Sequence, residues 1–280
     1  MKRLLDIEFH KFKYSKSSKV LTIIYLSIVI LSMLIGVVPF NFGSVQGKVA
    51  DLGVFNFPVV WHVSTYCISF LKIFIAIVIV SLTASEYSNR TIKQNLIDGL
   101  SKKELVLSKF YLATVLALIV TLLVFIVSLI LGLIYSDYND VGIIFSKMEY
   151  LPAFFLGHLV LFCFCLFAGV LVKRSAFALG FIAVWWIFEG FLNIISFVFD
   201  SKYDWNTYDY VSHILPMNAM SNLLYNPFPK ISLVKETLNL IPGNGMKWQF
   251  DVSYFDVISV LIWSTLFIYW SYLLIKKRDL

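Results

Sequence analysis

The sequence has little charge and almost no cysteine. Charged residues make up 14% of its 280 positions, and it contains 3 cysteines. Cys67, Cys163 and Cys165 all fall inside long apolar runs, which argues against the disulfide framework of a small secreted domain. Cys163 and Cys165 are two residues apart, so on a helix they point in nearly opposite directions and cannot hold one ion together. We therefore expect neither a disulfide scaffold nor a metal site.

Motifs for nucleotide binding and for catalysis are missing as well. The sequence contains no G-x-x-x-x-G-K-[ST] loop, whose backbone N–H groups would approach a phosphate. It also lacks the G-x-S-x-G of hydrolases and the H-E-x-x-H of zinc proteases. Glu86 and Arg90 match the E-x-x-x-R of an intramembrane protease class, but they lie in a predicted surface loop without a paired second glutamate. We predict no catalytic residue in this chain and no nucleic-acid binding.

Long hydrophobic runs, by contrast, are abundant. Hydrophobic residues make up 59% of the chain, and six runs reach the roughly 20 residues that a helix needs to cross a bilayer. Backbone polar groups in lipid must be satisfied within the segment, so such runs form helices. The sequence thus predicts an all-α, polytopic membrane protein that forms a single transmembrane domain over residues 1–280. The six predicted spans are 20–40, 61–83, 110–135, 151–172, 176–198 and 254–275.

The basic residues are distributed unevenly between the two sides of these spans. Lys and Arg number 23 against 17 Asp and Glu, and most of them fall in 1–19, 84–109, the connection after 172 and the C-terminal tail. By the positive-inside rule, both termini and these two connections are cytoplasmic. The first run begins after residue 19 and is too long for the apolar region of a signal peptide, so we expect it to remain as an anchor.

Two segments outside the spans are expected to touch the membrane surface. In 1–19, apolar and basic residues are interleaved, which favours an amphipathic helix on the inner surface over an unstructured positive tail. The longest predicted outer segment is 199–253, which contains several prolines. Within it, 214–224 is apolar enough for a short helix that dips toward the outer leaflet without spanning it.

The cytoplasmic segment 84–109 contains matched helix signals. Glu86 and Arg90 have the spacing of a helical ion pair, and Gly99 is positioned to stop the helix. Ser101 and Glu104 form a capping box that starts the next helix. An apolar stripe at helical spacing is formed by Ile92, Leu96 and Ile97. A compact helix and turn below the membrane therefore explains the segment better than a plain linker.

This segment closes the second of six spans in a pattern that resembles the permease subunits of type-2 ABC exporters. The resemblance extends to the amphipathic N-terminal helix, to both ends being inside and to the large outer loop before the last span. Where the family often has arginine after the turn serine, this chain has Lys102. The matching residues are Glu86, Asn89, Arg90, Thr91, Leu96, Gly99, Leu100, Ser101, Lys102 and Lys109.

The resemblance implies an ATP-driven exporter of the bacterial inner membrane. A separate ABC ATP-binding subunit would carry ATP and Mg, this chain would hold no cofactor, and two permease chains, identical or similar, would form the pore. The segment 84–109 would be the coupling helix that docks on the ATPase. The ATPase-docking candidates are Glu86, Arg90, Thr91, Leu96, Gly99, Ser101 and Lys102.

Two charged residues lie well inside predicted spans. Lys72 and Glu189 are each 13 residues from the inner end of their span, which places both near the midplane. Such residues are costly in lipid and turn toward a cavity or a partner. We predict that the second and fifth spans face each other and that the two residues either form a structural ion pair or contact substrate. The substrate-path candidates are Thr65, Ser69, Lys72, Glu189, Asn193 and Ser196.

Two other functions stay open. The chain could be the binding component of a vitamin importer, which would need an outward-facing pocket, or a membrane scaffold without a transport cycle. The sequence does not identify the substrate; a polar midplane with few charges favours an amphiphilic molecule over a free ion.

Overall fold

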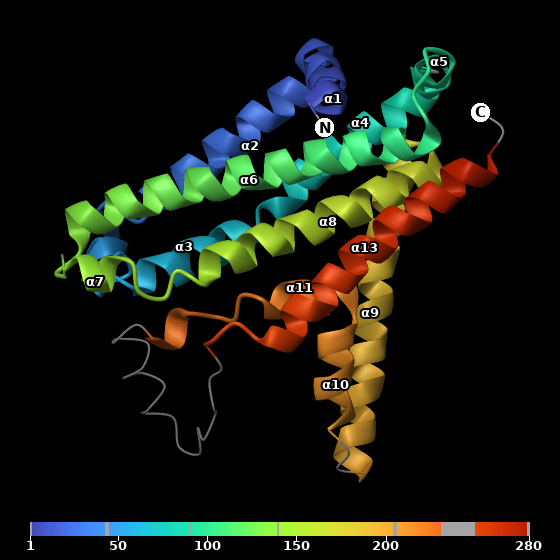
Figure 1. Ribbon diagram of the computed structural model, residues 1–280. Coiled ribbons are helices and arrows are strands. Elements are labelled where there is room, and N and C mark those ends of the chain that lie inside the picture. Colours follow the sequence, from blue (N-terminus) through green and yellow to red (C-terminus); the bar gives the residue numbers. More distant parts are fainter. Residues whose placement is uncertain are drawn as a thin grey trace.

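The computed structural model describes residues 2–42, 45–89, 91–138, 140–203, 206–230 and 250–278. Over these residues the fold is helical apart from one short hairpin, in which β1 (Phe40–Phe42) pairs antiparallel with β2 (Val45–Gly47). Five helices are long and apolar enough to span a membrane, and a bent pair provides a sixth span if its two halves are counted as one. The prediction of an all-α, polytopic membrane protein is therefore confirmed (Figure 1).

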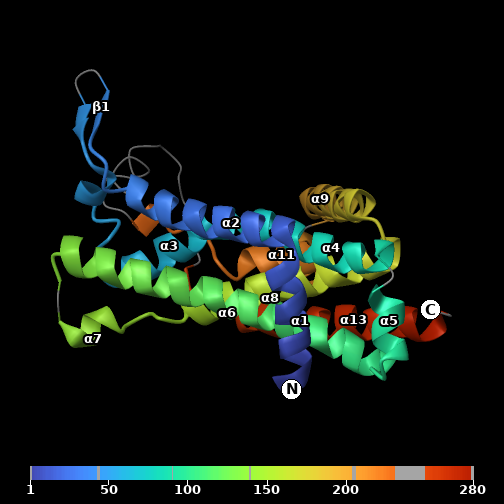
Figure 2. The same ribbon diagram turned by 90° about the horizontal axis from the view of Figure 1, so that it is seen from above.

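The first half of the chain contains the surface helix and three spans. The amphipathic helix α1 (Lys2–Tyr14) precedes the first span, as the sequence predicts. In Figure 2, α1 runs across α6 at a steep angle to the long helices. The elements that follow are α2 (Lys16–Ile35), η1 (Val49–Leu52), α3 (Val59–Ser69), α4 (Lys72–Ser88), α5 (Thr91–Ile97) and α6 (Lys102–Tyr135).

The second half contains the remaining spans and the outer segments. α8 (Tyr150–Val172), α9 (Ser175–Tyr203) and α13 (Tyr254–Lys277) are the long helices. Between them lie the short elements α7 (Val141–Ile144), α10 (Thr207–Ile214), α11 (Pro216–Asn222) and η2 (Phe228–Lys230). The predicted outer helix over 214–224 corresponds to α11, which packs against α8, α9 and α13.

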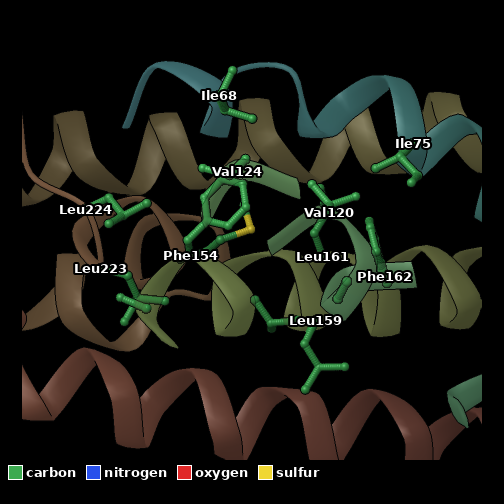
Figure 3. Close-up of a cluster of buried hydrophobic side chains, with 14 of the residues drawn as sticks. Ile68, Ile75, Val120, Val124, Phe154, Leu159, Leu161, Phe162, Leu223 and Leu224 are labelled. Carbon is green, nitrogen blue, oxygen red and sulfur yellow. The ribbon is translucent and has the colours of Figure 1, made fainter. Parts of the chain in front are cut away.

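α8 is the central helix of the bundle. It contacts α3, α4, α6, α9, α11 and α13, and its apolar residues cover all sides, as expected of a fully enclosed helix. Phe154 and Phe162 of α8 belong to the same buried cluster as Val120 of α6 and Ile75 of α4 (Figure 3). Gly169 permits close approach, because a Cβ there would lie 2.9 Å from Thr83 Cβ of α4. The spans thus pack around α8.

The second predicted span, 61–83, is broken. α3 and α4 meet at an angle of 48° across Phe70 and Leu71. No proline or glycine lies at the break. The hydroxyls of Thr65 and Ser69 donate to backbone carbonyls three or four residues earlier in α3, a contact that competes with the regular ladder and bends helices. The break brings Lys72 to the first turn of α4.

α9 diverges from the other long helices. Figure 1 shows it turning away from the bundle, with α10 alongside its far part. Its start packs against α4 and α8, but most of its apolar side chains beyond this point are exposed. We expect lipid or another apolar surface to cover them in the membrane. The second and fifth spans therefore touch, but only over part of their length.

Candidate functional site

The segment between α4 and α6 folds as the capping signals predict. Gly99 adopts φ 94°, in the left-handed region that favours glycine, and ends α5. The Glu104 backbone N–H donates to Ser101 Oγ at 3.2 Å, and the Ser101 N–H donates to Glu104 Oε2 at 2.9 Å. This reciprocal pair is the predicted capping box, and it starts α6.

α5 rests on an apolar cluster at one end of the bundle. Ile92 is buried and Leu96 is partly buried against the cluster, so two members of the predicted stripe are confirmed. Ile97, the third residue of the stripe, is 76% exposed and does not join the cluster. The buried members of the cluster come from α5, α6, α8 and α13: Ile92, Leu105, Val106, Leu166, Val170 and Ile275.

Basic side chains hold the C-terminal end of α13 against the same region by hydrogen bonds. Lys102 Nζ donates to the carbonyls of Arg278 at 2.8 Å and Lys276 at 3.2 Å, and so satisfies the C-terminal end of α13. Arg278 donates in turn to the carbonyls of Val170 and Leu171 at the end of α8. Lys102, a predicted docking residue, therefore also holds the C-terminal helix in place.

Glu86 has partners that the sequence did not suggest. Its expected partner Arg90 lies outside the described residues. Among the described residues, the Glu86 carboxylate meets Lys109 Nζ of α6 at 2.6 Å and Lys11 Nζ of α1 at 3.2 Å. Glu8 of α1 completes the group, 2.8 Å from Lys11 and 3.8 Å from Lys109. We call these four side chains, Glu8, Lys11, Glu86 and Lys109, the buried charge network.

The network is balanced and largely shielded from solvent. Glu8, Glu86 and Lys109 are 3%, 7% and 5% exposed. Burial alone would raise the pKa of Glu8, but Lys109, Lys11 and the hydroxyl of Ser108 outweigh it, so the pKa lies below its ordinary value. Ser108 Oγ lies 3.1 Å from Glu8 Oε1. Removing one charge of such a group leaves a buried charge without its counterpart, which is strongly destabilising.

α1 and α5 line an open cleft of about 790 Å³. Lys2, Arg3 and Lys11 contribute positive charge to its wall, and Asp6 and Asp98 contribute negative charge. Thr91, another predicted docking residue, also lines the cleft, and its hydroxyl lies 3.3 Å from the Glu86 carbonyl oxygen. The first turn of α5 is therefore close to both the cleft and the network.

Glu189 is buried on α9 and is held by groups other than lysine. The backbone N–H groups of Met217 and Asn218, at the start of α11, donate to its carboxylate at 3.0 and 3.2 Å. Trp185 Nε1 donates to the same carboxylate at 2.7 Å. These N–H groups lack partners within the short helix, so the acid acts as its cap. Glu189 therefore fixes the outer segment to α9.

The other two predicted residues of the α9 polar face, Asn193 and Ser196, also make hydrogen bonds. Asn193 Oδ1 accepts from Asn218 Nδ2 at 2.8 Å, which adds a second tie between α9 and α11. Ser196 Oγ donates to the Leu192 carbonyl within its own helix. The polar stripe of the fifth span thus meets α11 where we expected the second span.

No ion pair joins Lys72 to Glu189, although both are described residues. The divergence of α9 carries Glu189 toward α11. In the part of the chain that the structure describes, neither a hydrogen bond nor an ion pair holds the Lys72 side chain. Higher on the same face, His62 Nε2 lies 2.7 Å from the Tyr225 carbonyl oxygen and the ring stacks on Tyr150. The structural ion pair predicted from the sequence is therefore not formed.

The sequence reasoning missed Glu8, Lys11 and the amides of α11. A signal for Glu8 was present, because it follows the buried Leu4 by four residues and so shares its face of α1. An acid on the apolar face of a basic helix indicates a buried partner. No comparable signal marked Met217 and Asn218, whose backbone groups do the binding.

Comparison with protein-family models gives a match. The family model described as "ABC-2 family transporter protein" matches residues 4–199, which covers α1 to α8 and most of α9. No curated protein matches the chain in sequence.

Proposed function

This chain belongs to the ABC-2 transporter family, and we propose that it is the permease subunit of an ATP-driven exporter. An ABC permease works with an ATP-binding partner. The observation that carries the proposal is α5, a short helix held between α4 and α6, which are themselves joined to α1 by the buried charge network. Such an element can receive a push from a docked partner and pass it to several helices at once.

The proposed assembly contains an ABC ATP-binding subunit and a second permease chain, identical or similar. ATP and Mg would bind on the partner subunit. The membrane would be a bacterial inner membrane with both termini in the cytoplasm. In support, the N-terminal helix, α5 and the end of α13 lie toward the same end of the bundle (Figure 1), and that end carries most of the basic residues.

In the proposed cycle, ATP binding closes the ATPase subunits and moves α5. Thr91, Leu96, Gly99, Ser101 and Lys102 stay as docking candidates, with Glu86 acting from inside the network. We add the exposed Ile97 as the apolar contact at the end of α5. The bundle would then shift between inward-open and outward-open states.

The proposed substrate path runs along the second and fifth spans. Lys72, at the break between α3 and α4, has an ammonium group that can meet a substrate, and Thr65 and Ser69 precede it on α3. Glu189 and Asn193 hold α11, so they would control the outer part of the path, with Ser196 beyond them. A path with so few charges suits an amphiphilic substrate.

The test is a purification of the tagged chain in mild detergent from its native host. We expect a stoichiometric ATP-binding subunit to co-purify, and we expect Ile97→Asp to reduce its recovery at least fivefold. The matched control is Val141→Asp, an equally drastic change at a 70% exposed residue of α7, far from α5. If both variants recover the ATP-binding subunit equally poorly, α5 is not the docking site.

The same purification separates the competing functions. A chain that is recovered alone, or only with itself, has no energy source and would be a scaffold. A chain recovered with an ATPase that resists Ile97→Asp and that takes up a vitamin would be an importer component.

A further inference from the structure

The buried charge network connects elements that are far apart in the sequence. Glu8 and Lys11 are on α1, Glu86 is near the end of α4, and Lys109 is in the second turn of α6. Each lysine contacts a carboxylate of α4 and a carboxylate of α1. The network therefore joins three helices through one closed set of contacts.

Two residues of the network lie on either side of α5 in the chain. Glu86 comes just before α5 in the chain, and Lys109 comes just after the turn and cap that follow α5. Their contact at 2.6 Å closes the base of the connection that contains α5. A force on α5 therefore reaches α4 and α6 together, instead of separating them.

A second contact attaches α1 to the same connection. Arg3 at the start of α1 pairs with Glu104 in the first turn of α6 at 3.1 Å. This pair is exposed, whereas three members of the network are almost fully buried. Exposed pairs contribute little and buried ones are costly to break, so of these two polar contacts the network holds α1 more firmly.

We propose that Glu8, Lys11, Glu86 and Lys109 are positioning residues of the transport cycle, which make α1, α4 and α6 move as one unit when the ATPase pushes α5. This inference rests on the proposed function. None of the four residues has to touch ATP or substrate. Their contribution is to keep three helices together, so that the displacement of a seven-residue helix is not lost in local bending.

The experiment uses the complex of this chain with its ATP-binding subunit in nanodiscs. The test variant is Lys109→Met, and the matched control is Lys103→Met, the same change at an exposed lysine of the same helix. Two quantities are measured: amide hydrogen exchange of α1, and the ratio of the ATP hydrolysis rate in the complex to that of the free ATPase subunit. We expect Lys109→Met to retain the ATPase but to speed exchange in α1 at least tenfold and lower the rate ratio at least fivefold.

A network that only stabilises the fold would leave the rate ratio unchanged in folded protein, and that result overturns the proposal. An equal fall of the rate ratio in the control Lys103→Met would overturn the proposal as well. If Lys109→Met does not fold, the double variant Glu86→Gln with Lys109→Met replaces it, because Glu8 and Lys11 then remain as a balanced pair. If the folded double variant has the same rate ratio as the wild-type complex, the proposal is contradicted. If the wild-type chain binds no ATPase at all, the proposed function fails and this inference fails with it.

Discussion

Charges at the end of the bundle near α5 and charges inside the spans are satisfied in different ways. Near α5, two acids and two lysines from three helices neutralise one another. Inside the spans, Glu189 is satisfied by N–H groups of α11 and Trp185, and Lys72 has no such partner among the described residues. The first arrangement holds helices together, whereas the second leaves a cation available. This difference agrees with the proposal that the network transmits movement and that Lys72 contacts substrate.

The largest expected effect comes from breaking the balanced network. Lys109→Met leaves Glu8 and Glu86 close together without the lysine between them, and we expect the free energy of unfolding to fall by about 3–5 kcal/mol. Titration with a denaturing detergent measures it. The exposed Lys103→Met should change the free energy by less than about 0.5 kcal/mol. Equal effects of the two changes would show that Lys109 is not part of a buried network.

At the midplane, Glu189→Gln should have a moderate effect. An amide oxygen still accepts one hydrogen bond, but it loses the charge and one oxygen, so we expect a loss of about 1.5–3 kcal/mol. Hydrogen exchange should rise in α10 and α11 and stay unchanged in α1. Loosening of α1 in this variant would mean that the two regions are not independent.

Lys72→Met should leave stability unchanged or raise it. Removing a lone ammonium from the membrane relieves a cost of about 2.5–3.5 kcal/mol on insertion scales, and we know of no bond in the described chain that it breaks. The same detergent titration measures the effect. A loss of more than about 1 kcal/mol would show that Lys72 has a structural partner.

Acid should weaken the network through Glu8. Because the folded state lowers its pKa below the ordinary value of 4.5, the stabilisation is complete above that value and is lost as the pH falls through the lower, folded pKa. The difference in unfolding midpoint between the wild-type chain and Glu8→Gln should therefore be constant near neutral pH and shrink below about pH 4.5. A difference that shrinks between pH 8 and pH 6 would contradict this assignment.

The smallest expected effect is at the cap of α6. Ser101→Ala removes one half of the capping box and should cost about 1 kcal/mol. Hydrogen exchange should rise in the first turn of α6 alone. Ser212→Ala on the outer helix α10, where the serine donates within its own helix, is the control.

Much of the fold could be predicted from the sequence, because lipid restricts the choices. Apolar runs of spanning length give helices, and Gly99 with Ser101 and Glu104 gives the turn and cap before α6. The break between α3 and α4 could not be foreseen, since neither proline nor glycine marks it and hydroxyl contacts like those of Thr65 and Ser69 also occur in α6 and α13 without a break. Whether a serine or threonine bends its helix depends on its packing.

The site was harder to predict than the fold. Equal depth suggested that Lys72 and Glu189 pair, but depth along a span says nothing of the direction in which a helix diverges. The local pair of Glu86 with Arg90 stays a prediction, since Arg90 lies outside the described residues, and the partners that the structure shows for Glu86 come from α1 and α6, up to 75 residues away. Contacts across such distances depend on tertiary packing, which one sequence does not encode as a pattern.

A double-mutant cycle on Glu86 and Lys109 tests the central claim most directly. The free energy of unfolding is measured for the wild-type chain, Glu86→Gln, Lys109→Met and the double variant. If the two side chains belong to one buried network, the double variant should be more stable than the sum of the single losses predicts, by about 1.5–3 kcal/mol. Losses that add to within about 0.5 kcal/mol would show that the two residues do not interact, and the network would no longer explain how α5 is connected to the bundle.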